Sequence, residues 1–335
     1  MITVLETGVL NSVQDAGRLG FRHLGVSTSG VMDRLALQCG NMLLDNAADA
    51  ACIEVQTFPF VIRFDTETSF SVTGGDAPIT LNEKPVLPWF ALHARKGDVL
   101  RIGRPVSGAR MYVCVAGGLD VPVVLDSRST QLRGGFGGWQ GRPLQPNDQL
   151  PFCGPYCVGE VGLVPPAQSL ALDGSGEAEK TVILRVIPAT DYTLFTPQSQ
   201  TDFGTISWQI TAQSDRVGYR LKGGSLALER PVELRSYGVV PGIIQVPPSG
   251  VPIIQMADAN TAGGYPRIAT VIEADLWRLA QARIGSVIKF QLCEHAEGLA
   301  ADRDLQAYLA DAQYSIALYR KSLSRRGAGQ TGAKS

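Results

Sequence analysis

Short runs rich in apolar and β-branched residues dominate the chain. Between residues 52 and 160, Gly, Pro, Asn and Asp separate these runs at intervals of roughly 8–12 residues, which is typical of a β-sandwich or β-barrel. The predicted strands in this block are CIEVQ, FVIRF, SFSVTG, PITLN, DVLRI, ARMYVCVAGG and DQLPF. With a short strand at 2–6, they predict a first all-β subdomain, either a sandwich or a barrel, over residues 1–164.

A second block repeats this pattern after a polar stretch of small residues. Residues 165–180, PPAQSLALDGSGEAEK, have no apolar periodicity and are predicted to be a linker. The strands predicted after it are TVILRVIPA, GTISWQIT, YRLKG, GIIQVP, VPIIQM and SVIKFQL. Residues 181–295 therefore predict a second β subdomain.

Three segments carry apolar residues at helical spacing. They are residues 31–46, which Ser29 or Gly30 could begin, residues 269–282, and residues 299–323 near the C-terminus. We expect a C-terminal helix within 296–323 and a disordered tail over 324–335, where Gly, Ser, Lys and Arg predominate.

Composition limits the classes of function. Of the 335 residues, 44% are apolar and 18% are charged, and the net charge is −1. This balance gives no electrostatic reason to expect binding to nucleic acid or to an anionic membrane. The first residues lack the basic and apolar regions of a signal peptide, and no uninterrupted apolar run approaches the ~18 residues of a membrane span. We expect a cytoplasmic protein.

The common catalytic and metal-binding motifs are missing from the sequence. There is no Walker-type phosphate loop, no G-x-S-x-G, and the three histidines are scattered. Cys153 and Cys157 form C-x3-C, half of a metal site, but no second Cys or His pair follows at zinc spacing. We therefore expect six unpaired thiols and predict no metal.

Four polar clusters in predicted loops are the candidates for chemistry. Arginine offers a planar donor fork for a carboxylate or phosphate, and Asp and Gln can hold an amide N–H. The alternative for each cluster is local turn chemistry, in which Asp bonds its own backbone and Gly supplies positive φ. The clusters are VQDAGRLG (13–20), STSGVMDR (27–34), QSDRVGYRL (213–221) and IIQVPPSGVPIIQMADANTAGGYPRI (243–268).

At these clusters the sequence resembles a known family. Its members are called allophanate hydrolase subunit 2, the carboxyltransferase subdomain A and B part of urea carboxylase, and the C-type subunit of ATP-dependent 5-oxoprolinase. The stretches that carry the resemblance span about residues 3–291. Asp45 and Asp126 stand where the family usually has Gly, and Asn147-Asp148 replaces a Gly-Asp ending. These differences affect turns and leave the four polar clusters unchanged.

The resemblance implies a mainly β protein with a few helices, built from two cyclophilin-like β-barrel subdomains. It also implies an ATP-hydrolysing 5-oxoprolinase that opens 5-oxo-L-proline to L-glutamate only in complex with companion subunits. These companions would be a cyclophilin-like B-type chain and an A-type chain. The length of the chain favours this activity over the alternative, which is transfer of CO2 from carboxybiotin to urea or a related amide. The sequence has no biotin-carrier Met-Lys motif and no ATP-grasp region, so biotin or ATP-grasp functions would lie on another polypeptide.

The resemblance also suggests which residues act on the amide substrate. We predict that Asp215, Arg216 and Asp258 are catalytic, with Arg216 holding an anionic group and Asp215 or Asp258 acting on the amide proton. The predicted substrate-binding residues are Gln14, Asp15, Asp33, Arg34, Tyr219, Gln245, Asn260 and Tyr265. Preorganised donors of this kind stabilise a developing oxyanion by about 3–4 kcal/mol each.

A protein of a different class is the rival interpretation. Relatives of this family are linked to control of a sporulation kinase through a partner protein, which implies a non-catalytic interaction protein. A buried polar pocket lined by Asp215, Arg216, Asp258 and Gln14 would favour the enzyme. Dispersed and solvated positions for the same residues would favour the interaction protein.

Overall fold

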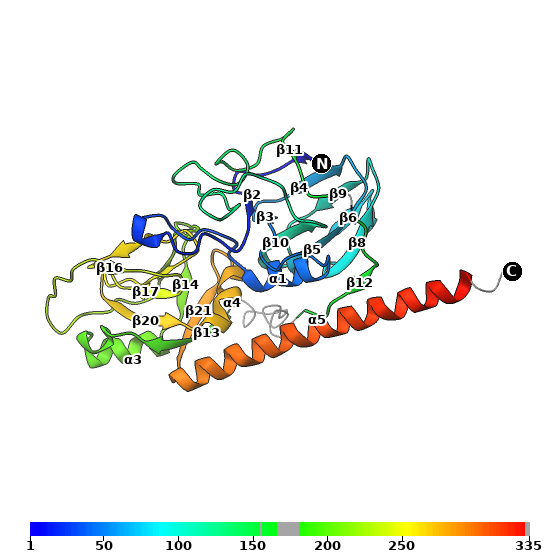
Figure 1. The fold of residues 1–335 in the computed structure, drawn as a ribbon. Coiled ribbons are helices and arrows are strands. Elements are labelled where there is room, and N and C mark those ends of the chain that lie inside the picture. Colours follow the sequence, from blue (N-terminus) through cyan, green and yellow to red (C-terminus); the bar gives the residue numbers. More distant parts are fainter. Residues whose placement is uncertain (155, 166–180, 332–335) are drawn as a thin grey trace.

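The computed structural model describes residues 1–154, 156–165 and 181–331, with side chains described up to residue 323. Two lobes lie side by side, and one long helix runs beneath both of them (Figure 1). We call residues 1–165 the first lobe and residues 181–292 the second lobe. Within the described ranges, no helix is long and apolar enough to cross a membrane.

The first lobe consists of two six-stranded sheets. One has the order β11-β1-β4-β9-β6-β7 and the other has the order β12-β8-β5-β10-β3-β2. The strands are β1 (Ile2–Glu6), β2 (Ser12–Gln14), β3 (Cys52–Val55), β4 (Phe60–Phe64), β5 (Thr68–Asp76), β6 (Ile79–Leu81), β7 (Lys84–Pro85), β8 (Phe90–Ala94), β9 (Val99–Ile102), β10 (Ser107–Val115), β11 (Gln149–Leu150) and β12 (Val161–Gly162).

One apolar core joins these two sheets. Ile62 of β4 and Val113 of β10 belong to the same buried cluster, and the rings of Phe64 and Phe70 lie 5.0 Å apart between the sheets. Successive residues of a strand point to opposite faces, so alternate residues of β10 serve a second core on the outer face. Tyr112 is one of these outer residues.

Helix α1 (Arg34–Met42) covers the outer face of the second sheet. Its N-cap is Asp33, whose side chain accepts from the backbone N–H of Ala36. Residues of β5 bind the helix backbone, since Thr73 Oγ1 donates to Ala36 O at 2.7 Å. The helix therefore begins later than the predicted Ser29 or Gly30, because both of these have positive φ.

The second lobe is a closed barrel with the strand order β13-β20-β17-β18-β15-β14-β21. Parallel pairing of β13 with β21 closes it. Trp208 and Phe203 are fully buried in its core. The strands are β13 (Thr181–Pro188), β14 (Trp208–Ile210), β15 (Gly218–Lys222), β17 (Ile243–Gln245), β18 (Ile253–Gln255), β20 (Arg267–Val271) and β21 (Val287–Leu292), while β16 (Tyr237–Gly238) and β19 (Ala262–Gly263) form a separate pair.

Three helices lie on or beside the barrel, and two of them, α4 and α5, also contact the first lobe. Helix α3 (Pro197–Thr205) packs on β21, and α4 (Leu276–Gln281) follows the 3-10 turn η4 (Glu273–Asp275). Helix α5 (His295–Thr331) begins beneath the barrel and returns along the first lobe (Figure 1). Ile316 of α5 is buried in the same cluster as Leu37 of α1.

The structure confirms a mainly β protein with few helices and a β-barrel. The predicted helix over 269–282 is wrong at its start, because residues 267–271 pair in the barrel and only Leu276–Gln281 is α-helical. Helix α5 also continues through 324–331, where a disordered tail was predicted, since extending an existing helix adds a hydrogen bond for each residue fixed. Most of the predicted linker, 166–180, and residues 332–335 lie outside the described residues.

Three positions that differ from the family pattern are turns with unusual backbone angles. Asp45, Asp126 and Asn147 have φ of 59°, 57° and 73°. Glycine adopts this left-handed conformation freely, and Asp and Asn are among the side chains that tolerate it best. The replacements therefore keep the turn geometry.

Candidate functional site

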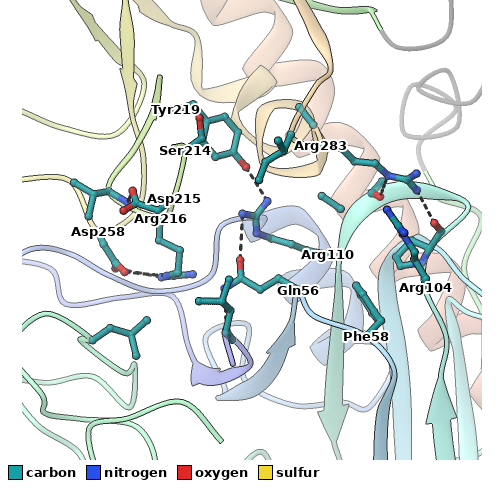
Figure 2. Close-up of a pocket in the computed structure, with 18 of the residues that line it drawn as sticks. Gln56, Phe58, Arg104, Arg110, Ser214, Asp215, Arg216, Tyr219, Asp258 and Arg283 are labelled. Atoms are coloured by element: carbon teal, nitrogen blue, oxygen red, sulfur yellow. Dashed lines mark hydrogen bonds and ion pairs between the residues drawn. The ribbon is translucent and has the colours of Figure 1, made fainter. Parts of the chain in front are cut away.

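A cavity of about 760 Å³ lies between the two lobes (Figure 2). Its walls come from the segment after β3 and from β10 of the first lobe, and from the residues around β15 and α4 of the second. Five arginines and two aspartates line it, together with the polar side chains of Gln56, Ser214 and Tyr219 and a set of apolar residues. The charged lining residues are Arg104, Arg110, Arg133, Asp215, Arg216, Asp258 and Arg283.

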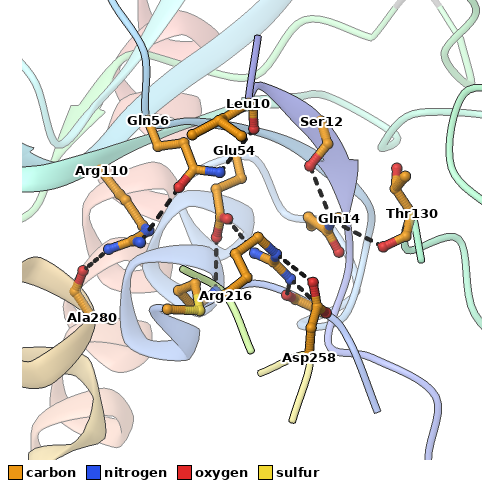
Figure 3. Close-up of polar contacts among 12 residues, drawn as sticks. Leu10, Ser12, Gln14, Glu54, Gln56, Arg110, Thr130, Arg216, Asp258 and Ala280 are labelled. Atoms are coloured by element: carbon orange, nitrogen blue, oxygen red, sulfur yellow. Dashed lines mark hydrogen bonds and ion pairs between the residues drawn. The ribbon is translucent and has the colours of Figure 1, made fainter. Parts of the chain in front are cut away.

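A buried ion network crosses the boundary between the lobes at the base of this cavity (Figure 3). Arg216 Nε donates to Asp258 Oδ2 at 2.9 Å, and Arg216 Nη1 donates to Glu54 Oε1. The side chains of Arg216, Asp258 and Glu54 are 5%, 8% and 0% exposed. Glu54 lies on β3, and Arg216 and Asp258 belong to the second lobe. The Arg216–Glu54 ion pair therefore links the two lobes.

Further hydrogen bonds hold Glu54 in place. Its Oε2 accepts from the backbone N–H of Met32 at 2.7 Å and from the Tyr112 hydroxyl at 2.9 Å. Burial alone would lower the pKa of Arg216, but the nearby carboxylates of Asp258 and Glu54 raise it above its usual value. The guanidinium is therefore a permanent charge, and its partners fix its orientation.

Arg110 forms a second guanidinium site on the cavity wall. Its Nη1 donates to the Tyr219 hydroxyl at 2.8 Å and to Ala280 O, and its Nη2 donates to Gln56 Oε1 at 3.4 Å. Burial lowers the pKa of Arg110, and the electrostatic effects of Tyr219 and Glu54 outweigh this, so the net change is upward.

Gln281 of α4 links this wall to the N-terminus of α1. Its Oε1 accepts from the backbone N–H groups of Ala109 and Arg110, at 2.9 and 3.1 Å. Its Nε2 donates to Asp33 Oδ2 at 2.8 Å. Burial raises the pKa of Asp33 to about 6, although hydrogen bonds from Gln281 and Ala36 act in the opposite direction. Asp33 is thus a helix cap and a support for the wall, and it does not line the main cavity.

Four of the residues predicted from sequence line the cavity: Asp215, Arg216, Tyr219 and Asp258. Asp215 lies at the edge of the cavity. Its Oδ1 accepts from the backbone N–H groups of Val217 and Gly218, at 2.8 and 3.1 Å. This is the local turn chemistry considered as the alternative for this cluster. Asp258 is the better-positioned carboxylate, because Arg216 holds it against the cavity.

Gln14 and Asp15 are both buried and do not line the cavity, and Gln14 lies next to the ion network (Figure 3). Gln14 Nε2 donates to Ser12 Oγ and to Thr130 O, at 3.0 and 3.2 Å. Asp15 accepts from Gly17 N at 2.8 Å and from the Ser127 hydroxyl at 2.7 Å, so it ties two loops together. Both residues have well-defined structural contacts.

The remaining predicted residues lie outside the cavity. Arg34 is half exposed and its Nη1 is 4.0 Å from Glu273 Oε1. Gln245 is buried at the end of the barrel and donates to the backbone oxygen of Tyr265, whose own ring is exposed. Asn260 is exposed and accepts from Arg133 Nη1 at 2.7 Å, so it contacts a lining residue without lining the cavity itself.

Sequence reasoning missed several lining and supporting residues because they lie in strands and their borders. Glu54 is a charged residue at a buried position of the CIEVQ run, and Arg110 begins the apolar stretch of ARMYVCVAGG. A charge at such a position is costly to bury unless it is paired, so it signals a buried network. Arg104 also lines the cavity, is exposed, and forms no ion pair within the described ranges.

The arrangement suits a small anionic or amide ligand. Guanidinium groups bind carboxylates and phosphates through parallel donors, and the exposed Arg104 has donors available. Asp258 presents a carboxylate that can accept an N–H. Apolar surface from Leu10, Phe58 and Ile284 completes the walls. A concave site with few convergent polar groups is typical of a small-molecule site.

Fold and site together define a two-lobed β protein with a charged cavity between a two-sheet lobe and a barrel. The family described as carboxyltransferase domain, subdomain A and B, matches residues 24–292. The chain belongs to this family. It is 40% identical over 311 residues to the C-type subunit of 5-oxoprolinase from Haemophilus influenzae and 39% identical over 308 residues to the protein of that name from Escherichia coli, covering 92% of this chain and 96% of each relative.

Larger proteins contain a similar region. Urea amidolyase of Lachancea kluyveri is 32% identical over 303 residues, which are 86% of this chain and 16% of that protein. The crystal structure of Kluyveromyces lactis urea carboxylase matches with a TM-score of 0.82 and 28% identity over 92% of this chain. This chain spans only 29% of that structure and 20% of the K. lactis urea amidolyase structure, which matches with a TM-score of 0.81 and 28% identity.

Proposed function

We propose that this chain is a subunit of a cytoplasmic, ATP-dependent 5-oxoprolinase that opens 5-oxo-L-proline to L-glutamate. The observation that carries the proposal is the interlobe cavity, in which Arg216 fixes Asp258 and Arg104 presents exposed donors. Two relatives that are named as the C-type component of 5-oxoprolinase, matched over nearly their whole length, support this activity over others of the family. The companions would be A-type and B-type subunits, and ATP would be used by the complex.

The substrate has two groups that this cavity can recognise. Its carboxylate would bind Arg104 at the rim, where a guanidinium can form two parallel hydrogen bonds. Its ring N–H would face Asp258, which would take the N–H proton when ATP activates the carbonyl oxygen and return a proton to the nitrogen when the C–N bond breaks. Arg110 and Tyr219 would face the carbonyl side. Amide resonance makes the ring carbonyl unreactive, so ATP would supply the activation that precedes water attack.

Arg216 acts in this proposal by positioning. Asp258, Glu54 and the backbone of Gly30 occupy the donors of its guanidinium, so it has little capacity left for substrate. Its contribution is to keep the Asp258 carboxylate aimed at the cavity. This differs from the role predicted from sequence, in which Arg216 itself held an anionic group.

A biotin-dependent carboxyltransferase is the second candidate function. The likeness to urea amidolyase and urea carboxylase favours it. The same donors would then hold a carboxylated cofactor and an amide acceptor, with biotin delivered on a separate carrier chain. The rival interaction protein is less well supported, because Asp215, Arg216 and Asp258 line one cavity and Gln14, although outside it, is buried instead of solvated.

Reconstitution with purified A-type and B-type subunits tests the proposal. We expect glutamate release from 5-oxoproline that needs ATP and stops when this chain is omitted. Arg104→Ala should raise KM for 5-oxoproline at least about tenfold while kcat changes less, because a charged hydrogen bond to bound substrate contributes about 1.5–3 kcal/mol.

Arg101→Ala is the matched control, since Arg101 is an exposed neighbour of the same charge that pairs with Glu6 outside the cavity. Equal KM values for the two variants would remove Arg104 from the site. Absence of glutamate with carboxylation of urea from carboxybiotin would favour the carboxyltransferase. A stable complex with neither activity would favour the interaction protein.

A further inference from the structure

Three side chains with metal-binding atoms meet on the first lobe, away from the cavity. They are Glu67, which precedes β5, His93 of β8, and Cys157 in the segment before β12. The carboxylate oxygen, imidazole nitrogen and sulfur all lie within 4.8 Å of one another. His93 Nε2 is 2.9 Å from Glu67 Oε1. None of the three lines the interlobe cavity.

The backbone brings these residues together. His93 is the cross-strand partner of Ser69 in the antiparallel pairing of β5 with β8. Glu67 lies two residues before Ser69, so its side chain projects from the same face, next to His93. Both neighbours of Cys157 attach to Ser69, because Ser69 N donates to Tyr156 O at 2.9 Å and Val158 N donates to Ser69 Oγ at 3.0 Å. The position of Cys157 over the sheet is therefore built into the fold.

We propose that Glu67, His93 and Cys157 form a zinc site. A thiolate, an imidazole and a carboxylate are the three donors that Zn²⁺ uses in proteins, at bond lengths of about 2.0–2.3 Å. Magnesium and calcium prefer oxygen ligands throughout, so this mixed set favours zinc over them. The thiolate and carboxylate together balance the ion's two charges. Three protein ligands leave a fourth tetrahedral position for water.

Binding requires modest changes at this exposed site. The three donor atoms now lie up to 4.8 Å from one another, and they would have to move closer together to bind one ion. The cysteine must lose its proton, and His93 must exchange its contact with Glu67 for a nitrogen–metal bond. Side-chain rotation can provide these shifts, since Glu67 and Cys157 are exposed and His93 is partly exposed.

This site uses one cysteine of the C-x3-C pair that the sequence marked as half of a metal site. Cys153 and Cys157 form C-x3-C, but among the described residues only Cys157 has metal-binding partners from β8 and the start of β5. Cys153 is also an exposed free thiol, and its backbone packs at the Gly117–Gly118 turn instead. Cys153 is therefore a matched control within the same chain.

The test is titration of the metal-stripped full-length protein with Zn²⁺ alone, in competition with a chromophoric chelator. We expect about one ion per chain. Cys157→Ser and His93→Ala should each weaken binding at least about 100-fold, because even changes to groups that only orient the ligands commonly cost 10–100-fold. Titration with Co²⁺ should give a thiolate-to-cobalt charge-transfer absorption in the wild type that Cys157→Ser removes.

Cys153→Ser and His23→Ala should bind as the wild type does. All substituted positions are exposed or half-buried, and circular dichroism confirms folding of each variant. Wild-type affinity in Cys157→Ser, or equal losses in Cys153→Ser and Cys157→Ser, would overturn the proposal and indicate adventitious binding to surface groups. Lack of binding by the wild type would overturn it as well. None of these outcomes bears on the 5-oxoprolinase proposal, because the cluster and the cavity share no residue.

Discussion

Replacing Glu54 with Gln tests whether the buried ion network holds the lobes together. The side chain is fully buried, and its two oxygens accept from Arg216, Met32 and Tyr112. In Glu54→Gln, one oxygen can still serve Met32 and Tyr112, but the amide N–H₂ would face the Arg216 donor. Arg216 then keeps only Asp258 as a charged partner.

The expected loss of stability is about 3 kcal/mol. Removing one member of a buried ion pair typically costs about 3–5 kcal/mol, and the retained Asp258 places this case at the lower end. Urea unfolding followed by tryptophan fluorescence measures the change, since Trp139 lies in the first lobe and Trp208 in the barrel. Because the network spans both lobes, the variant should also unfold in two separated steps.

Glu6→Gln is the control for a change of the same chemistry at the surface. Glu6 and Arg101 are about half exposed, and their pair should contribute less than about 1 kcal/mol. The double variant Glu54→Gln with Arg216→Met should lose less than the sum of the two single variants, because it leaves no unpaired charge from this pair. A Glu54→Gln protein within about 1 kcal/mol of wild type, with one unfolding step, would refute the reasoning.

Two further predictions concern stability. The pKa of Asp33 is about 6 in the folded protein, against an ordinary value of 3.8, so the folded state binds the Asp33 proton more tightly than the unfolded state does. The free energy of unfolding should therefore fall by about 3 kcal/mol as the pH rises from about 4 to about 6. Urea unfolding from about pH 4 to 7 measures this dependence, which a folded Asp33→Asn protein should lack; an equal slope in both would contradict it. Gly17→Ala should destabilise by at least about 1 kcal/mol more than Gly20→Ala, because both have positive φ but a Cβ on Gly17 meets backbone oxygens at 2.9 Å whereas Gly20 has open space. Matching melting temperatures for the two glycine variants would show that the contact is relieved without cost.

The strand pattern could be predicted because each strand carries its own local signal. FVIRF and TVILRVIPA alternate or continue in apolar residues between turn residues, and both are strands in the structure. Whether such strands form a barrel or two sheets depends on pairings between distant segments, such as β13 with β21. The sequence shows no local mark of these pairings, so the strand pattern alone could not decide between a sandwich and a barrel for the first lobe.

The site was predictable where loops carry its residues. Arg216 and Asp258 stand in polar clusters with glycine nearby, and the structure pairs them. Arg34 and Tyr265 occur in equally polar clusters, yet neither lines the cavity. The packing of the two lobes decides how far each side chain lies from the cavity and which way it points. Glu54 was missed because a single charged residue inside a strand does not indicate a site by itself. Its role depends on Arg216 of the other lobe, and the sequence does not show that the two residues are paired.

The return of helix α5 to the first lobe affects how the protein is assembled during synthesis. Ile316 and Leu37 belong to one buried cluster, so the outer face of α1 and its sheet stays uncovered until the final helix has left the ribosome. The first lobe must therefore wait for the barrel to be made before its second core is complete. Chaperones that shield apolar surface would act during this interval, and a chain interrupted before α5 would expose that face to other molecules.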